Sequence, residues 1–350
     1  MIIENNGVKY QKCFQRVTWN GGINGTFRTL EFECEDIYSN FKVGDKISFK
    51  LENTDTLFEG RVFSVSKTAN SSVVTIKAVD NGIYLNRNHF VKNFYNKVPS
   101  EIVKEICGEL KLGIGRLPQD TVKCTFPAID RTGYEILLMA YTIQHNKDKK
   151  IYSVACNNGK IEILDENVML ETELTSYDNI RDTVFRTDLD RMVNQVFVYK
   201  TDGNSGQIID KVANEENKSK YGLFQEVLQY NEDMNNILNA RDMLKGLNER
   251  ATVVVDGNVN LQAGYTVAIK EERTGLYGTF LIAEDTHTWK DGDYETRIEL
   301  VFENAMDKIA LETERSKREI QDDLYKFTDE KLSKEYEEQK RVGKQYYLRF

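Results

Sequence analysis

Apolar and polar residues alternate along two segments of the chain, one near its start and one near its end, and the two segments are alike. The first contains VGDKISFK, LFEGRVFSVSKT and SVVTIKAV within residues 43–79, and the second contains AGYTVAIK, LYGTFLIAEDTHT and YETRIELVF within residues 263–302. Alternation with a period of two is typical of β-strands with one buried face. The repeat predicts two similar antiparallel β-barrels in one chain.

Four glycines define the repeat, and we interpret them as turn residues. The alignment of the two copies matches Gly44 with Gly264 and Gly60 with Gly278. Glycine favours turns because it adopts a positive φ at no steric cost. Upstream of the first copy, Leu30, Phe32 and Cys34 alternate with glutamates, which predicts a strand with one apolar and one acidic face.

Two helices and a hairpin are expected between the copies. VPSEIVKEICGELKLG has apolar residues at helical spacing, and Thr132 and Glu135 have the spacing of a capping box at the start of a second helix. Asn157, Asn158 and Gly159 then separate two short strands and favour a hairpin turn. This part of the chain therefore predicts a small α+β domain.

The strand pattern returns afterwards and gives way to a charged tail. MVNQVFVYKTDG and GQIIDKVAN predict a hairpin, and a helix is expected from about Asn231 to Lys245 before the second copy. The predicted fold is α+β and mainly β, with four domains: a first β-barrel at 1–94, a helix–helix–hairpin domain at 95–167, a second β-barrel with an inserted helix at 168–303, and a charged C-terminal helical tail at 304–350.

The tail ends in aromatic and apolar side chains, which we consider as a candidate docking site for a partner: Tyr346, Tyr347, Leu348 and Phe350. An aromatic tip on a polar helix is suited to bind a partner protein. The alternative is that the tip packs back on its own domain.

Composition and charge narrow the class of protein. Of the 350 residues, 29% are charged and 40% apolar, as is ordinary for a soluble globular protein. The net charge of -9 argues against a nucleic-acid-binding surface, and no apolar run is long enough to predict a membrane span. The N-terminus lacks the pattern of a secretory signal, and the five cysteines are dispersed, so we expect reduced cysteines in a cytoplasm.

Candidate chemistry is sparse. The three histidines have no metal-ligand spacing: His89, His145 and His287. Carboxylate pairs such as Glu31 with Glu33 and Glu271 with Glu272 are what a glycosidase needs, but a solvated strand face carries the same residues. We therefore expect no catalytic residues, no cofactor and no metal.

The order of barrel, helical insertion and barrel with a crossing helix resembles the baseplate hub family of contractile phage tails and tail-like bacteriocins, the PBSX-type or late-control-D hub proteins. The resemblance covers about residues 1–303 and rests on these strings: LFEGRVFSVS, PSEIVKEICGELKL, RTGYEILLMAYTI, DRMVNQVFVY, SKYGLFQEV and LQAGYTVAIKEERTGLYGTFLIAEDTHTWKDGDYETRIEL. It includes no signature of catalytic residues.

This resemblance implies a structural role. Three chains with two barrels each would form a pseudo-sixfold ring that joins a sixfold tail tube to a threefold central spike, which resolves the mismatch in symmetry. The implied partners are further copies of the chain in a homotrimer, the tail tube protein, the central spike protein, and a tape measure or other baseplate proteins. The implied location is the bacterial cytoplasm during assembly and then the tail baseplate or a released tail-like particle.

Two alternatives stay open. One is a tail-tip peptidoglycan hydrolase that uses an acidic pair, although no segment looks like an added enzymatic domain. The other is a cell-wall-binding module in residues 95–167. For the hub, the acidic balance of the chain suggests a channel lined by carboxylates, which would repel the phosphates of passing DNA.

Overall fold

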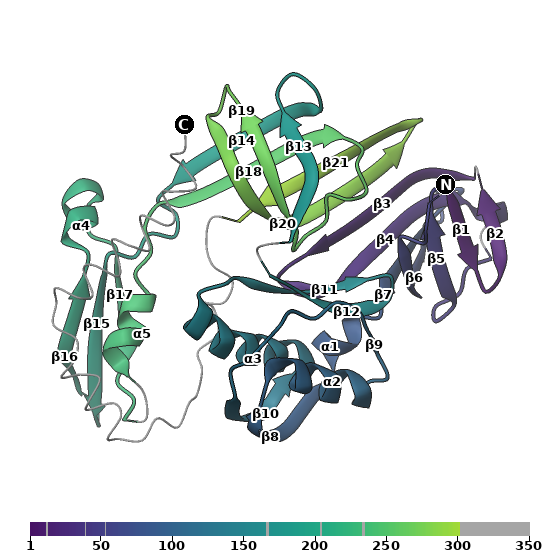
Figure 1. Ribbon diagram of the computed structural model, residues 1–350. Coiled ribbons are helices and arrows are strands. Elements are labelled where there is room, and N and C mark those ends of the chain that lie inside the picture. The colour runs from purple at the N-terminus through teal and green to yellow at the C-terminus, as the bar shows by residue number, and fades with distance from the viewer. Residues whose placement is uncertain are drawn as a thin grey trace. The chain divides into compact units, whose positions relative to one another are not determined.

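The computed structural model describes residues 1–11, 13–38, 40–52, 54–165, 168–203, 205–232 and 235–301. In these residues the chain forms two compact units: Met1–Val184 together with the described residues from Ala251 onward, and Phe185–Arg250 (Figure 1). The predicted tail at 304–350, with its docking candidates Tyr346, Tyr347, Leu348 and Phe350, lies outside the described residues.

The first copy of the repeat is an antiparallel part of a sheet in the first unit, and the name first copy is used below for all the strands of this part of the sheet. Its strands are β1 (Ile2–Asn5), β2 (Val8–Gln11), β3 (Phe14–Gly22), β4 (Gly25–Glu35), β5 (Lys46–Lys50), β6 (Phe58–Lys67) and β7 (Val73–Asp80), with a short 3-10 helix at Asp36–Tyr38. Leu30, Phe32 and Cys34 are buried, and the glutamates between them face away from the core. The predicted two-faced strand is therefore confirmed.

The second copy is a sheet in the same unit. Its strands are β13 (Met169–Thr175), β14 (Ile180–Asp188), β18 (Asn248–Asp256), β19 (Thr266–Glu271), β20 (Leu276–Lys290) and β21 (Asp293–Leu300). The long strand β20 also pairs with β3, from Glu284 opposite Gly22 to Lys290 opposite Arg16. The two copies thus form one sheet of 13 strands in the described part of the chain (Figure 1).

The predicted fold class, mainly β and α+β, is confirmed, but the pairings between the strands that the structure describes do not close either copy into a barrel. In the described residues β2, β13 and β14 are end strands with one neighbour each. The core of the first copy nevertheless includes a residue of the second, because Trp289 of β20 packs 5.2 Å from Phe49, measured between ring centroids.

The segment between the copies covers part of this unit with helices. Its elements are α1 (Ile83–Arg87), β8 (His89–Lys97), α2 (Pro99–Glu109), β9 (Gly113–Ile114), β10 (Cys124–Thr132), α3 (Gly133–Asp148), β11 (Tyr152–Asn157) and β12 (Lys160–Asp165). The predicted capping box is confirmed, because the Glu135 amide donates to Thr132 Oγ1 at 3.2 Å and the Thr132 amide donates to the Glu135 carboxylate at 2.8 Å. Asn158 and Gly159, both with positive φ, form the predicted β11–β12 turn.

The second unit is a small sheet with two helices. Its elements are β15 (Gln195–Asp202), β16 (Ser205–Ala213), α4 (Glu215–Tyr221), β17 (Gln225–Gln229) and α5 (Asn236–Asp242). The predicted hairpin is β15 with β16. The predicted helix from Asn231 to Lys245 is longer than the observed one, because α5 spans only Asn236–Asp242. Asn235 caps its start, where the Asn235 side chain accepts a hydrogen bond from the Leu238 amide at 3.2 Å.

Candidate functional site

The two copies of the repeat share one strand topology. The strand order is β3-β4-β7-β6-β5-β1 in the first and β14-β18-β21-β20-β19-β13 in the second, and the chain runs through matching strands in the same sequence. The copies differ in three places, and the first is that β2, the partner of β1, has no counterpart beside β13 in the described residues. A short turn at Gly22–Gly25 joins β3 to β4, whereas the whole second unit joins β14 to β18. In addition, β1 is antiparallel to β5, whereas β13 is parallel to β19.

Gly44 and Gly264 occupy equivalent positions. Their φ values are +91° and +92°, in the region that favours glycine. The Gly44 amide donates to the carbonyl of Val62 at 2.8 Å, and the Gly264 amide donates to the carbonyl of Ile282 at 2.9 Å. The same turn therefore leads into β5 and into β19.

Gly60 and Gly278 are not equivalent, and neither lies in a turn, so this part of the predicted alignment was wrong. Gly60 lies inside β6 opposite Ile47, and Gly278 lies inside β20 opposite Ile269. Phe280, not Gly278, takes the place of Gly60, because it pairs with Val267, the counterpart of Ile47. Hydrogen bonding between strands sets this register. The alignment from sequence was misled because Leu57-Phe58 before Gly60 looks like Leu276-Tyr277 before Gly278.

Gly60 is needed for a different reason, the close approach of a neighbouring strand. A Cβ added there would lie 2.2 Å from the carbonyl oxygen of Val79. We expect Gly60→Ala to lower the free energy of unfolding by about 1–3 kcal/mol, measured by urea denaturation. In Gly108→Ala, inside α2, the added Cβ meets nothing within 4 Å, so this control should gain up to about 1 kcal/mol. Equal stability of both variants would contradict the prediction.

Both copies also contain the same β-bulge. It separates Val62 from Ser64 in the pairing of β6 with β7, and Ile282 from Glu284 in the pairing of β20 with β21. A bulge bends a strand and increases its twist. Beyond it, β20 continues past β19 and takes β3 as its new neighbour. Among the described residues, the corresponding part of β6, Ser64–Lys67, pairs only with β7.

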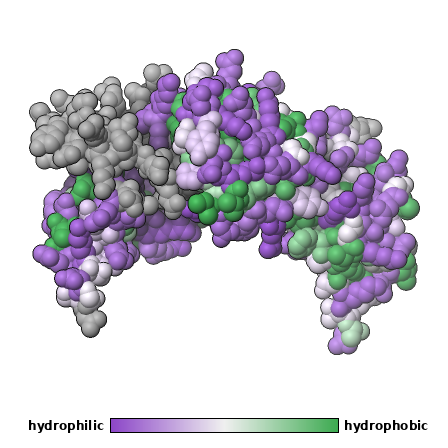
Figure 2. All heavy atoms as spheres, turned by 90° about the horizontal axis from the view of Figure 1, so that it is seen from below, coloured by the Kyte–Doolittle hydropathy of each residue, from purple (hydrophilic) through white to green (hydrophobic). Residues whose placement is uncertain are grey.

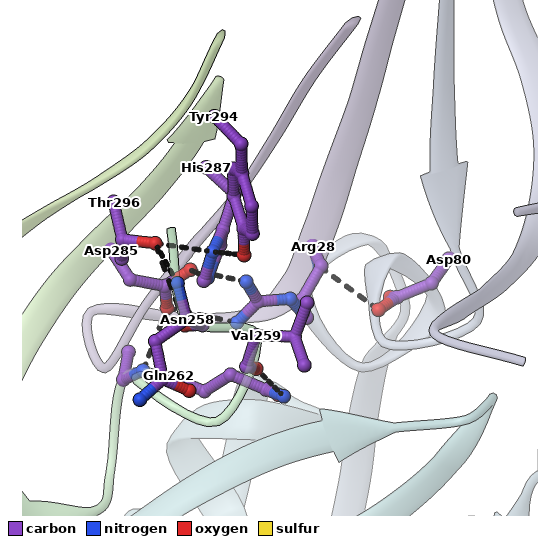
Figure 3. Close-up of polar contacts among 10 residues, drawn as sticks. Arg28, Asp80, Asn258, Val259, Gln262, Asp285, His287, Tyr294 and Thr296 are labelled. Atoms are coloured by element: carbon purple, nitrogen blue, oxygen red, sulfur yellow. Dashed lines mark hydrogen bonds and ion pairs between the residues drawn. The ribbon is translucent and has the colours of Figure 1, made fainter. Parts of the chain in front are cut away.

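A buried polar cluster lies where β20 meets β3 and β4 (Figure 3). The Arg28 guanidinium binds the Asp285 carboxylate through two nitrogens, one at 2.9 Å, and the Ala263 amide donates to the same carboxylate at 2.7 Å. His287 Nε2 lies 3.1 Å from Asp285, and the Arg28 guanidinium carbon lies 3.9 Å above the ring of Trp19. Asp285 and His287 are fully buried, so this cluster joins the two copies in the interior.

The charges of the cluster are set by burial and by Arg28. Burial by itself would raise the pKa of Asp285, but the Arg28 charge and the contacts of His287 and Arg28 lower this pKa to about 2. Burial lowers the pKa of His287, against the opposing effect of Asp285. Asp285 is therefore a carboxylate and His287 a neutral imidazole near neutral pH.

The pKa of Asp80 shifts in the opposite direction from that of Asp285. Asp80 accepts hydrogen bonds from the amides of Arg28 at 3.0 Å and Gly82 at 2.9 Å, but burial outweighs them and raises its pKa to about 7. Because this pKa lies above the unfolded value, the stabilisation from protonated Asp80 is complete at low pH and is lost as the pH rises towards 7.

We therefore expect wild type to lose stability relative to Asp80→Asn between about pH 5 and 7, by at most about 1.4 kcal/mol per pH unit. Urea denaturation of both proteins at a series of pH values measures this difference, and Asp36→Asn, at an exposed carboxylate, is the control. A difference that does not change with pH would contradict the assignment.

The remaining candidates from the sequence are dispersed. His89 is exposed beside Asp130, and His145 Nδ1 lies 2.7 Å from the carbonyl of Lys150. Glu271 accepts hydrogen bonds from its own turn, at Arg273 and Thr274. In the described residues no group of histidine, cysteine and acidic side chains has the arrangement of a metal site, and no helix is long and apolar enough to cross a membrane.

Sequence reasoning missed one exposed apolar surface, on the ribbon of β8 and β10. Val91 and Ile129 lie opposite each other there, and both are more than two-thirds exposed, as is Tyr95. Figure 2 shows such hydrophobic areas as small patches surrounded by hydrophilic surface. The sequence of β8 could have indicated this surface, because buried and exposed side chains alternate along the strand: Phe94 points to the core and its neighbours do not.

Comparisons with known proteins agree with this architecture. The profile of the YqbQ-like family matches residues 17–301. YqbQ of Bacillus subtilis (strain 168) is 25% identical over 288 residues, which cover 77% of this chain and 84% of YqbQ. XkdQ, a protein of the phage-like element PBSX of the same organism, is 24% identical over 296 residues, which cover 78% of this chain and 86% of XkdQ. The resemblance to PBSX-type proteins is thereby confirmed.

A solved structure shows the same fold. The 43 kDa tail protein of prophage MuSo2 from Shewanella oneidensis aligns with a TM-score of 0.65 at 14% identity, over 86% of this chain and 97% of that one.

Proposed function

Because the chain belongs to the YqbQ-like family, we propose that it is a structural component of a phage-type tail and forms the hub of its baseplate. Three copies form a pseudo-sixfold ring that joins the tail tube to the central spike and surrounds the channel. The ring locates the protein in the tail baseplate of a virion or of a released tail-like particle. Its role there is mechanical and not catalytic.

The observation that carries this proposal is the repeated topology. Each chain contains two copies of the repeat with the same strand order, the same glycine turn and the same bulge. A trimer of such chains presents six similar copies of the repeat, whereas a trimer of chains with a single copy presents three. Two similar copies in one chain thus suit an adaptor between threefold and sixfold partners, the spike and the tube.

The polar face of the sheet is a candidate lining for the channel. Glu31 of β4 lies between Thr18 of β3 and Lys77 of β7, and Glu33 lies opposite Arg16. Acidic side chains therefore alternate with basic ones and with hydroxyls, a surface without a continuous basic patch that would retain DNA. A ring whose lumen is basic would contradict this part of the proposal.

The mass and shape of the purified full chain test the ring. We expect light scattering to give three times the 40.5 kDa mass of one chain, and negative-stain electron microscopy to show a threefold ring with a central hole. The tail tube protein should stack on it. A chain that is monomeric alone and with the tube protein would contradict the hub.

Zymography on peptidoglycan separates the hub from the hydrolase alternative. We expect no cleared band from the full chain, whereas the hydrolase predicts one. The cell-wall-binding alternative for residues 95–167 predicts that the chain co-sediments with purified sacculi. Both alternatives stay predictions from the sequence.

A further inference from the structure

We propose that β6 of one chain pairs with β14 of a neighbouring chain. This joint between two chains repeats the joint that β20 and β3 form within one chain. The proposal rests on the ring proposed above and specifies which sheet edges close it. The pairing residues are Ser64–Lys67 of β6 and Ile180–Val184 of β14, and the partner is a second copy of this chain.

The pairing of β20 with β3 inside one chain is the template for the proposed joint between chains. Seven residues of β20 beyond the bulge, from Glu284 to Lys290, pair antiparallel with Gly22 to Arg16 of β3. The joint places Trp19 beside His287 and brings Trp289 into the core of the first copy. One copy of the repeat therefore recognises the other through one defined pair of edges.

The β6 edge is the unoccupied counterpart of the β20 edge. β5 covers β6 only from Phe58 to Arg61, as β19 covers β20 only from Leu276 to Leu281. Beyond the bulge, the described residues of β6 have β7 as their only neighbour. Unpaired backbone amides and carbonyls along such an edge are a template for another strand.

The β14 edge is the unoccupied counterpart of the β3 edge. β14 borders β18 as β3 borders β4, and it starts at the end of β18, where the Asp256 amide donates to the Asn179 carbonyl at 3.0 Å. The two strands are thus antiparallel, as β3 and β4 are. Whereas β3 has β20 on its other side, β14 has no second neighbour in the described residues, and Val184 is 53% exposed.

The β6 edge of one chain complements the β14 edge of the next chain. Each chain has one free edge of the β20 kind, on β6, and one of the β3 kind, on β14. Contacts between chains are therefore head-to-tail, and first and second copies of the repeat alternate around the ring. Such heterologous contacts close into a ring when the rotation at each joint allows it. The bulge before each joint supplies the same bend at every step around the ring.

The joint between chains lacks the polar cluster of the joint within a chain. Val65 of β6 occupies the position of Asp285, and Lys67 that of His287, so the carboxylate that holds Arg28 is absent. The internal joint is fixed by buried charges, and the external joint relies on backbone pairing and apolar contact. This difference suits a chain that folds first and assembles afterwards.

Engineered disulfides test the pairing in the full-length chain. Cysteine is placed at Ser66 and at either Asp182 or Val184, in a Cys13→Ser background that leaves only the buried cysteines Cys34, Cys107, Cys124 and Cys156. Residues that face each other across antiparallel strands are close enough for a disulfide. We expect mild oxidation to convert one of the two combinations into covalent trimers, seen on a non-reducing gel.

Three control variants distinguish this joint from other contacts. Ser66→Cys alone and Val184→Cys alone should give at least about tenfold less cross-linked product, because a head-to-tail joint does not bring identical residues together. Val8→Cys with Val184→Cys should give equally little, because Val8 is about as exposed as Val184 but lies on β2, a different end strand of the sheet.

The outcomes separate the joint from the ring. Covalent trimers from a designed pair support the joint. A ring by light scattering and microscopy without designed cross-links, or with cross-links only through Val8, overturns the joint and leaves the hub. A chain that forms no ring alone or with the tube protein, and no cross-link, overturns both.

Discussion

Asp285→Ala is expected to lower the free energy of unfolding by about 3–5 kcal/mol, the range found when one partner of a buried ion pair is removed. The Arg28 guanidinium would then be left in the interior without its carboxylate, and the Ala263 amide would lose its acceptor. Urea denaturation followed by circular dichroism at pH 7 measures the loss.

Two variants show whether the buried charge is the cause. Glu173→Ala breaks the exposed Glu173–Lys270 pair and should cost less than about 1 kcal/mol. The double variant Arg28→Met with Asp285→Leu removes both charges and should be more stable than Asp285→Ala alone. If Asp285→Ala and Glu173→Ala lose equal stability, the ion pair does not hold the two copies together.

Trp19→Ala should also lower the free energy of unfolding by about 3–5 kcal/mol. Trp19 is 1% exposed, its ring lies 4.8 Å from that of His287 between centroids, and it stacks under Arg28. Its removal opens a cavity at the joint of β3 with β20 and also ends the cation–π contact. The fluorescence of Trp289, the other tryptophan, reports the unfolding of the same joint.

The control for this variant is Tyr95→Ala, which truncates an aromatic residue that is 70% exposed on β8. It should change stability by no more than about 0.5 kcal/mol. Similar losses in Trp19→Ala and Tyr95→Ala would show that the joint does not depend on the packing of Trp19.

Features of the fold with local signals could be predicted from the sequence. The alternation of Leu30, Phe32 and Cys34, the capping box of Thr132 and the Asn158–Gly159 turn each depend on residues a few positions apart, and each has the predicted structure. The duplication was also visible, because both copies need the same alternation to bury the same face.

The joint itself could not be predicted, because nothing local shows that β20 pairs with β3 from the other end of the chain. The glycine alignment failed for a related reason: pairing register depends on the partner strand, and Gly60 and Gly278 look alike without being equivalent. One signal was available in the string EDTHTW, where Asp285 and His287 alternate in phase with Trp289. Polar residues in phase with a core tryptophan indicate a buried polar cluster.

The long-range pairing of β3 with β20 has a consequence for how the protein is made. During synthesis the edge of β3 emerges early, but Trp289, which completes the core of the first copy, emerges only after most of the chain. At about 5–20 residues per second the wait is on the order of tens of seconds, during which an unpaired strand edge is exposed to other nascent chains. The core of the first copy is thus completed only after β20 has been synthesised, so the first copy folds fully together with the second and not before it.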